Sequence, residues 1–123
     1  MRLARFAAWL AALFVVSFSA QTHAAGALAT GQCGAFGYAY DDDSPEAAAL
    51  RARAQCKGRD CKVVTMFRRT CAAFAIDGRN ACGPNGWGQA ATMQQAKLAA
   101  TESCTRFGGR NCVTRVWLCD KRG

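Results

Sequence analysis

Two stretches of equal length decide the fold: SPEAAALRARAQC, residues 44–56, and TMQQAKLAATESC, residues 92–104. Self-similarity at a fixed offset indicates a duplicated structural unit. We therefore predict two pseudo-repeats, over about residues 33–71 and 72–119. The matched positions are Ala48 with Ala96, Ala52 with Ala100, GRDC over residues 58–61 with GRNC over residues 109–112, and Gly37-Tyr38 with Gly86-Trp87.

The residues that open each stretch are typical of helix N-termini. Ser44 is a preferred N-cap residue ahead of Pro45 at the first helical position, and Thr92 forms a capping box with Gln95. We predict helices over residues 45–57 and 93–107. Helical spacing predicts two small buried faces: Ala47, Leu50 and Ala54 in the first helix, and Met93, Ala96, Ala100 and Phe107 in the second.

The segments around the helices are typical of strands. Alternating or β-rich runs cover residues 35–40, 62–68, 71–76, 87–90 and 113–119, and turn residues separate them. The order of elements predicts an α+β domain made of a duplicated β-α-β-type unit. We expect one antiparallel or mixed sheet carrying two helices, stapled by disulfides, with Tyr38 and Trp87 packed against the helix of their own repeat.

The start of the chain resembles a secretory signal peptide. Arg2 and Arg5 precede an uncharged apolar run over residues 6–20, which is too short to span a bilayer as a helix. We predict cleavage after Ala24, which lowers the formal charge from +8 to +6. We expect a flexible N-terminal segment over residues 25–32, a single domain over residues 33–120, and no membrane span after cleavage. The protein is then periplasmic or secreted.

Eight cysteines in a short exported chain predict a disulfide framework. Spacing alone cannot select one pairing of eight cysteines, but the repeat narrows the choice. The spacing of the cysteines and an oxidising compartment argue against a zinc site. The lack of a Cys-x-x-Cys motif argues against redox catalysis. The pairing that best respects the repeat is Cys56 with Cys61, Cys104 with Cys112, Cys71 with Cys119, and Cys33 with Cys82.

The spaced cysteines and a Gly86-Trp87-Gly88 motif resemble a bacterial family of exported proteins, the domain of unknown function numbered 4189. The resemblance covers about residues 34–119. It implies a small exported domain and transfers no catalytic residue. It also implies a core of six cysteines, to which Cys33 and Cys82 are additions, in agreement with their pairing. The other segments that carry the resemblance are residues 34–38, 48–56, 61–64, 67–73, 96–104 and 112–119.

The residues of the mature chain offer little catalytic chemistry. Cleavage removes His23, the only histidine, which excludes a Ser-His-Asp triad and a Cys-His pair. The acidic run Asp41-Asp42-Asp43 lacks the ligand spacing of a calcium loop and precedes a helix N-terminus, where negative charge is favourable. The glycine-rich stretch 83–88 lacks the lysine of a phosphate-binding loop. We therefore expect that the protein is not an enzyme and that it binds no metal ion and no cofactor.

The basic surplus and the aromatic residues indicate binding instead. We expect a non-catalytic binding module for a protein in the cell envelope, of the inhibitor or immunity type. An anionic envelope polymer is the alternative partner, and a small carboxylate-based hydrolase is a weaker alternative. No nucleic acid is expected, because no nucleic-acid-binding motif is visible. The candidate binding residues are Tyr38, Tyr40, Arg68, Arg69, Trp87, Arg115 and Trp117.

Overall fold

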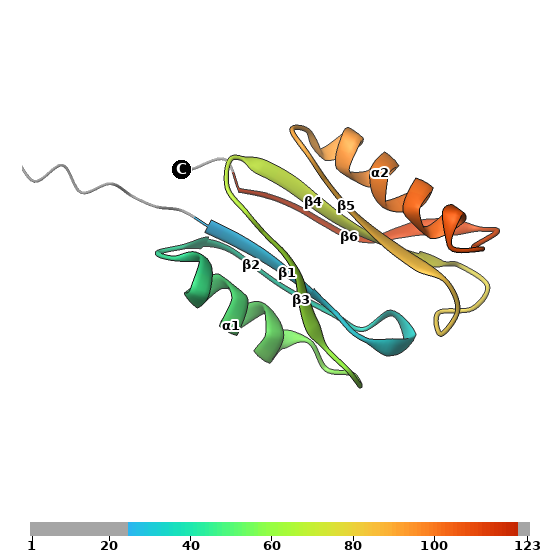
Figure 1. Cartoon of the computed structure of the whole chain (residues 1–123), viewed down its shortest axis with the longest axis horizontal. Coiled ribbons are helices and arrows are strands. Elements are labelled where there is room, and N and C mark those ends of the chain that lie inside the picture. Colours follow the sequence, from blue (N-terminus) through green and yellow to red (C-terminus); the bar gives the residue numbers. More distant parts are fainter. Residues whose placement is uncertain (1–24, 121–123) are drawn as a thin grey trace, which may run out of the picture.

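The computed structural model describes residues 25–120, which form two similar halves (Figure 1). Each half contains two strands, a helix and a third strand, in that order. The first half consists of β1 (Ala25–Thr30), the short 3-10 helix η1 (Gln32–Gly34), β2 (Phe36–Asp42), α1 (Pro45–Gln55) and β3 (Lys62–Phe67). The second half consists of β4 (Thr70–Asp77), β5 (Asn85–Ala90), α2 (Met93–Arg106) and β6 (Cys112–Asp120).

Each half forms its own three-stranded antiparallel sheet, in the order β2-β1-β3 and β5-β4-β6. The duplicated α+β architecture is confirmed, but the expectation of one sheet is wrong. The two sheets stack face to face, with α1 covering the outer face of the first and α2 that of the second (Figure 1). Four layers result because every strand has one face toward a helix and one toward the other sheet.

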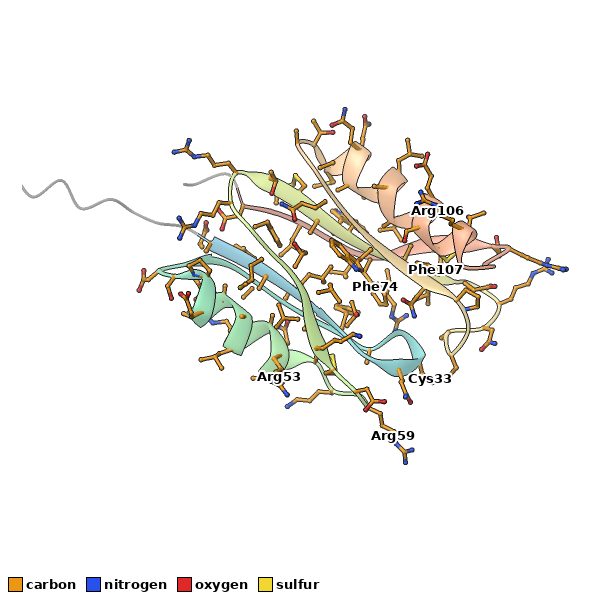
Figure 2. All side chains as sticks on the ribbon, viewed as in Figure 1. Cys33, Arg53, Arg59, Phe74, Arg106 and Phe107 are labelled. Carbon is orange, nitrogen blue, oxygen red and sulfur yellow. A yellow bond between two sulfur atoms is a disulfide. The ribbon has the colours of Figure 1, made fainter. Side chains whose placement is uncertain are left out.

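The core between the sheets carries the large side chains. Phe74 of β4 is fully buried there, beside Leu28 of β1 and Phe67 of β3 (Figure 2). The two cores between a sheet and its helix are built mostly from alanine and cysteine. Small side chains let each helix lie close to its sheet.

The helices begin where the sequence predicts, and they end one or two residues earlier than predicted. Ser44 Oγ accepts the backbone N–H of Ala47 at 3.1 Å, and Thr92 Oγ1 accepts that of Gln95 at 3.2 Å. These bonds satisfy N–H groups that have no partner inside the helix.

The buried faces of the helices agree with the prediction only in part: Ala96 and Ala100 are buried as predicted, and the other predicted positions are not. Ala47, Leu50 and Ala54 are exposed, and so are Met93 and Phe107. The buried positions are Ala48, Ala52 and Cys56 along the first helix, and Ala96, Ala100 and Cys104 along the second. These six residues match one another across the repeat, so the two helices bury equivalent positions.

Glycines allow the close approach of each helix to its sheet. A Cβ atom on Gly37 would lie 2.0 Å from the carbonyl oxygen of Ala52, and one on Gly86 would lie 2.3 Å from the backbone nitrogen of Cys104. The residues that face the helices are therefore these glycines. Tyr38 packs into the core between the sheets, and Trp87 is the cross-strand neighbour of Phe74, so the expectation that Tyr38 and Trp87 pack against their own helices is wrong.

The segment predicted to be flexible contains the central strand of the first sheet. All six residues of β1, AGALAT, are buried between β2 and β3, and the domain therefore begins at residue 25. The predicted signal peptide, residues 1–24, lies outside the described residues.

Four disulfides join Cys33 to Cys82, Cys56 to Cys61, Cys71 to Cys119 and Cys104 to Cys112, which confirms the predicted pairing. Two of them close the end of a helix onto the following strand in matching positions of the repeat. The bridge between Cys33 and Cys82 links η1 to the β4–β5 loop and so joins the two halves. Within residues 25–120, no helix is long and apolar enough to cross a membrane.

Candidate binding surface

The candidate binding residues occupy several separate places. Tyr38 and Tyr40 extend along β2 in a stacked row with Phe36, with ring centroids 6.4 and 6.3 Å apart. Tyr40 at the end of the row is 51% exposed, whereas Tyr38 is half-buried between the sheets. Most of this row therefore belongs to the core.

Arg115 helps to join the two halves. It lies at an irregularity in the pairing of β6 with β4, where Phe74 pairs with Val116 and Ala75 with Thr114. Its Nε atom donates to the carbonyl oxygen of Gly34 at 2.9 Å, and its guanidinium carbon lies 5.7 Å from the ring centre of Phe36. A guanidinium held by a backbone carbonyl and an aromatic ring is fixed in place.

Arg68 and Arg69 form the link between β3 and β4, at the end of the sandwich opposite η1. Both side chains are exposed, and Arg69 has a left-handed backbone with φ of 53°. They are thus remote from the Arg115 cluster. Trp87 lies on the edge strand β5 and is 40% exposed. Arg68, Arg69 and Trp87 therefore do not form one surface with Trp117.

Trp117 lies beside α2 on the outer face of the second sheet. Its Cα partner in the ladder is Ala73, which belongs to the core beneath α2. Lys97 of α2 places its Nζ atom 3.8 Å from the centre of the Trp117 ring, and the ring remains 45% exposed. Contact with a cation holds the indole in one orientation while part of its surface stays accessible to a partner.

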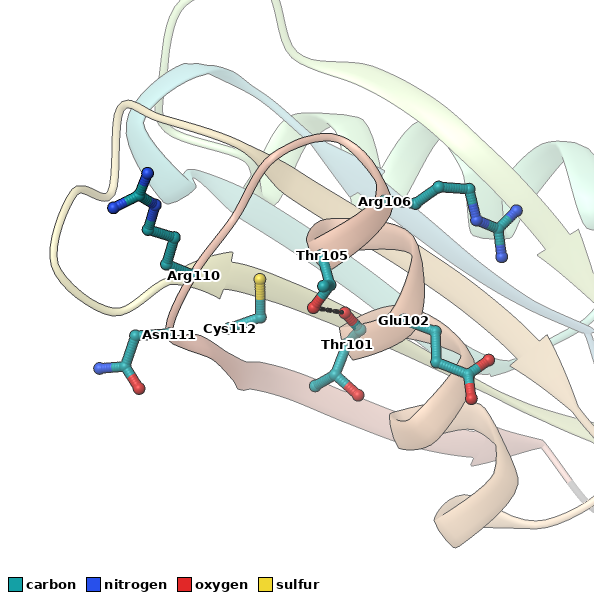
Figure 3. Close-up of a pocket in the computed structure, with 7 residues that line it drawn as sticks. All are labelled: Thr101, Glu102, Thr105, Arg106, Arg110, Asn111 and Cys112. Atoms are coloured by element: carbon teal, nitrogen blue, oxygen red, sulfur yellow. Dashed lines mark hydrogen bonds between the residues drawn. The ribbon is translucent and has the colours of Figure 1, made fainter.

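An open groove of about 610 Å³ follows the same side of α2 toward its C-terminal end (Figure 3). It exists because α2 packs mainly over β4 and β5 and leaves the outer side of β6 partly uncovered. Lys97, Thr101 and Thr105 are spaced by four residues and therefore share one side of the helix. We use the name α2–β6 groove for this hollow together with Lys97, one helical turn before Thr101, and Trp117 beside it, which lie beyond the lining of the hollow itself. Its lining residues are Thr101, Glu102, Thr105, Arg106, Arg110, Asn111 and Cys112.

The charged side chains of the groove lie at its rim. Figure 3 shows the guanidinium groups of Arg106 and Arg110 pointing away from each other, with Thr101 and Thr105 between them. The Oγ1 atom of Thr105 donates to the carbonyl oxygen of Thr101 at 3.0 Å. Sequence reasoning missed these threonines and Lys97, because nothing in the sequence indicates which side of α2 faces β6.

Two acidic side chains, those of Asp42 and Asp120, are buried and have partners within the fold. Asp42 is buried, and its Oδ1 atom lies 3.1 Å from Arg51 Nη2. The backbone N–H of Asp41 donates to Asp120 Oδ2 at 3.3 Å. The run of three aspartates is therefore split between the interior and the surface, where Asp43 lies. Among residues 25–120 there is no group of three or more His, Cys, Asp or Glu side chains that could hold a metal ion.

Asp77 anchors the turn after β4. The backbone N–H of Arg79 donates to its Oδ1 atom at 2.9 Å, and that of Arg110 to its Oδ2 atom at 3.4 Å. These bonds, the one from Arg79 first, hold the pKa of Asp77 below its usual value. The carboxylate thus ties the β4–β5 loop to the segment before β6.

A family model described as Domain of unknown function (DUF4189) matches residues 25–119 of the chain. The chain belongs to the DUF4189 family. This confirms the resemblance seen in the sequence, and the match includes β1, so the buried first strand is part of the DUF4189 domain. No curated protein and no solved structure matches this DUF4189 chain.

Proposed function

We propose that this DUF4189 protein is an exported, non-catalytic binding module that holds a protein partner of the cell envelope in the α2–β6 groove. The single observation that carries the proposal is the exposed ring of Trp117, fixed by Lys97 next to an open groove. Tryptophan and arginine dominate the energetics of protein interfaces when a partner can cover them. Here Trp117 serves as the anchor, and Arg106 and Arg110 form the rim.

The framework behind the groove is rigid, which favours binding. The bridge from Cys104 to Cys112 closes the C-terminal end of α2 onto β6, so the two walls of the groove cannot separate there. A surface that is ordered before binding loses little conformational entropy when the partner arrives. The cations Lys97, Arg106 and Arg110 outnumber the single acidic side chain, Glu102, which favours an acidic segment on the partner.

The compartment supports an envelope partner. Four disulfides indicate an oxidising environment outside the cytoplasm. Periplasm or secretion is the finer localisation that we propose. An inhibitor or immunity-type protein needs a stable, preformed surface and no catalytic group, and the α2–β6 groove meets that requirement.

The test is affinity capture of the mature, oxidised protein from an extract of its own cell envelope, followed by mass spectrometry. We expect one partner that is retained by the native protein and lost with Trp117→Ala. Leu50→Ala is the matched control, because Leu50 is 71% exposed on the opposite helix. A partner that binds both variants equally, or the absence of any specific partner, contradicts the proposal.

An anionic envelope polymer is the second candidate, and one specific observation favours it. Lys57, Arg59 and Arg115 line an open hollow of about 360 Å³ at the end of α1, next to η1. Binding to exposed cations weakens as salt screens them. Polymer binding that is lost in 0.5 M salt (roughly a 4 Å screening length) and with a Lys57→Ala, Arg59→Ala double variant, but not with Trp117→Ala, would identify this function instead.

A further inference from the structure

One buried acidic group is only half satisfied. Asp42, the last residue of β2, is 6% exposed. Its Oδ1 atom contacts Arg51, but its Oδ2 atom is buried and has no hydrogen-bond partner among the described residues. A buried carboxylate oxygen without a donor is unfavourable, and native structures satisfy such groups almost always. Asp42 therefore points to a missing donor.

The neighbour of Asp42 across the first sheet is the first residue of the domain. Ala25 opens β1, is 1% exposed, and is the Cα partner of Asp42 in the antiparallel ladder. Opposite Cα atoms in such a ladder lie about 4.5–5.5 Å apart. A group attached to the Ala25 nitrogen is thus within reach of the Asp42 side chain.

Removal of the leader converts the backbone nitrogen of Ala25 from a peptide amide into an α-amino group. Hydrolysis of the peptide bond between Ala24 and Ala25 consumes one water and leaves a carboxyl group on Ala24 and an α-amino group on Ala25. An α-amino group has a pKa of about 8, so it is protonated at neutral pH and offers three N–H donors. The family match begins at residue 25, the same residue that the cleavage pattern predicts as the first of the mature chain.

We propose that cleavage after Ala24 creates an α-ammonium group that forms a buried ion pair with Asp42. The inference rests on the proposed export of the chain, since an unprocessed chain carries an amide at Ala25. The ammonium supplies the donor that Oδ2 lacks, while the guanidinium of Arg51 stays on Oδ1. Asp120, which is also buried at this end of the sandwich, receives the backbone N–H of Asp41.

The pair gives the leader a structural role beyond targeting. Before cleavage, the first strand lacks its terminal charge and Asp42 lacks its second partner. After cleavage, the terminus of β1 is fixed at the edge of the core beneath α1. We therefore expect the domain to reach its full stability only when its first residue is Ala25.

The first measurement is the intact mass and N-terminal sequence of the exported protein. The second measurement is a double-mutant cycle in urea with four oxidised proteins. Two have the native sequence and start at Ala25 or at Ala24, and the other two carry Asp42→Asn in each of these chains. We expect the extra Ala24 and the Asp42→Asn substitution each to lower the urea concentration at the unfolding midpoint. Both together should lower it no further than either one alone. Asp43→Asn is the matched control, because Asp43 is exposed, and Asp120→Asn tests the neighbouring acid.

The third measurement follows the α-amine directly. A limiting amine-reactive reagent at pH 7 should label Ala25 at least tenfold more slowly in the native protein than in urea, and Asp43→Asn should not change that ratio. This measurement needs no variant that weakens the fold. A mature terminus other than Ala25, additive losses in the cycle, coupling to Asp120 in place of Asp42, or an equally reactive amine in the native protein overturns the proposal. An exported chain that starts at Ala25 but shows no coupling leaves the binding function untouched.

Discussion

Replacing both Cys33 and Cys82 with alanine opens the bridge that joins the two halves of the molecule. The two cysteines are 49 residues apart, and both are exposed, so the change removes a chain constraint and leaves no cavity in the core. Chain-entropy arguments for a loop of this length give a loss of roughly 4 kcal/mol in the free energy of unfolding. That is a large share of the stability of a small domain.

The bridge between Cys71 and Cys119 provides the matched comparison. It closes a loop of nearly the same length, 48 residues, so its chain-entropy contribution is also roughly 4 kcal/mol. Cys71, however, is fully buried beneath α2. Its replacement by alanine also removes packed atoms, and we expect the Cys71→Ala, Cys119→Ala variant to lose more stability than the variant without the exposed bridge.

Equilibrium unfolding in urea, followed by tryptophan fluorescence and circular dichroism, measures both losses. The slope with urea should rise in each variant, because an unfolded chain with one cross-link fewer exposes more surface. A loss below about 1 kcal/mol for the exposed bridge would refute the loop-closure reasoning. Equal losses for the two variants would refute the added contribution of burial.

Three further outcomes follow from local geometry. Gly86→Ala drives a Cβ atom into the backbone of α2 and should lower the free energy of unfolding in urea by about 1–3 kcal/mol; unchanged stability would contradict the close approach. Thr92→Ala removes the acceptor for the N–H of Gln95 and should cost about 1 kcal/mol in the same assay, whereas Thr92→Ser should cost much less. The hydrogen bond from the backbone N–H of Arg79 holds the pKa of Asp77 below its usual value. The ionised carboxylate therefore stabilises the fold above about pH 4. This stabilisation is lost as the pH falls through the lowered pKa. The stability difference between the native protein and Asp77→Asn should therefore shrink in acid, and a difference that stays constant from pH 6 to about pH 2 would contradict that account.

The duplication made the disulfides and the helix positions predictable. Helices capped at Ser44 and Thr92 place Cys56 and Cys104 at equivalent ends, so each pairs with the cysteine at the start of the next strand, which is Cys61 just before β3 and Cys112 in β6. The buried helix faces were harder to predict because alanine occurs on every side of α1. Apolar spacing correctly selected Ala96 and Ala100 in α2, but in α1 it selected the exposed Leu50 and missed Ala48 and Ala52, which match Ala96 and Ala100 across the repeat.

The first strand and the candidate groove could not be predicted from the sequence, and the physical reason differs between the two. The sequence AGALAT of β1 has no aromatic residue and only one β-branched residue, Thr30, so it carries little of the signal that indicates strands. Its alanines at positions 25, 27 and 29 are small because they pack in the close contact beneath α1. The exposure of Trp117 depends on how far α2 extends over β6, which is a matter of tertiary packing. Strand alternation alone cannot distinguish a face under a helix from a face under another sheet.

The two covalent connections between the halves lie at opposite ends of the sandwich. Only Arg68 and Arg69 separate β3 from β4 at one end, and the bridge from Cys33 to Cys82 closes the other (Figure 1). Because the halves are joined at both ends, neither end can act as a hinge about which the sheets separate, and Phe74 stays fully buried between them. A partner of the kind proposed above would then contact the outer surface, and we expect the slowest amide hydrogen exchange in β1 and β4, the two middle strands.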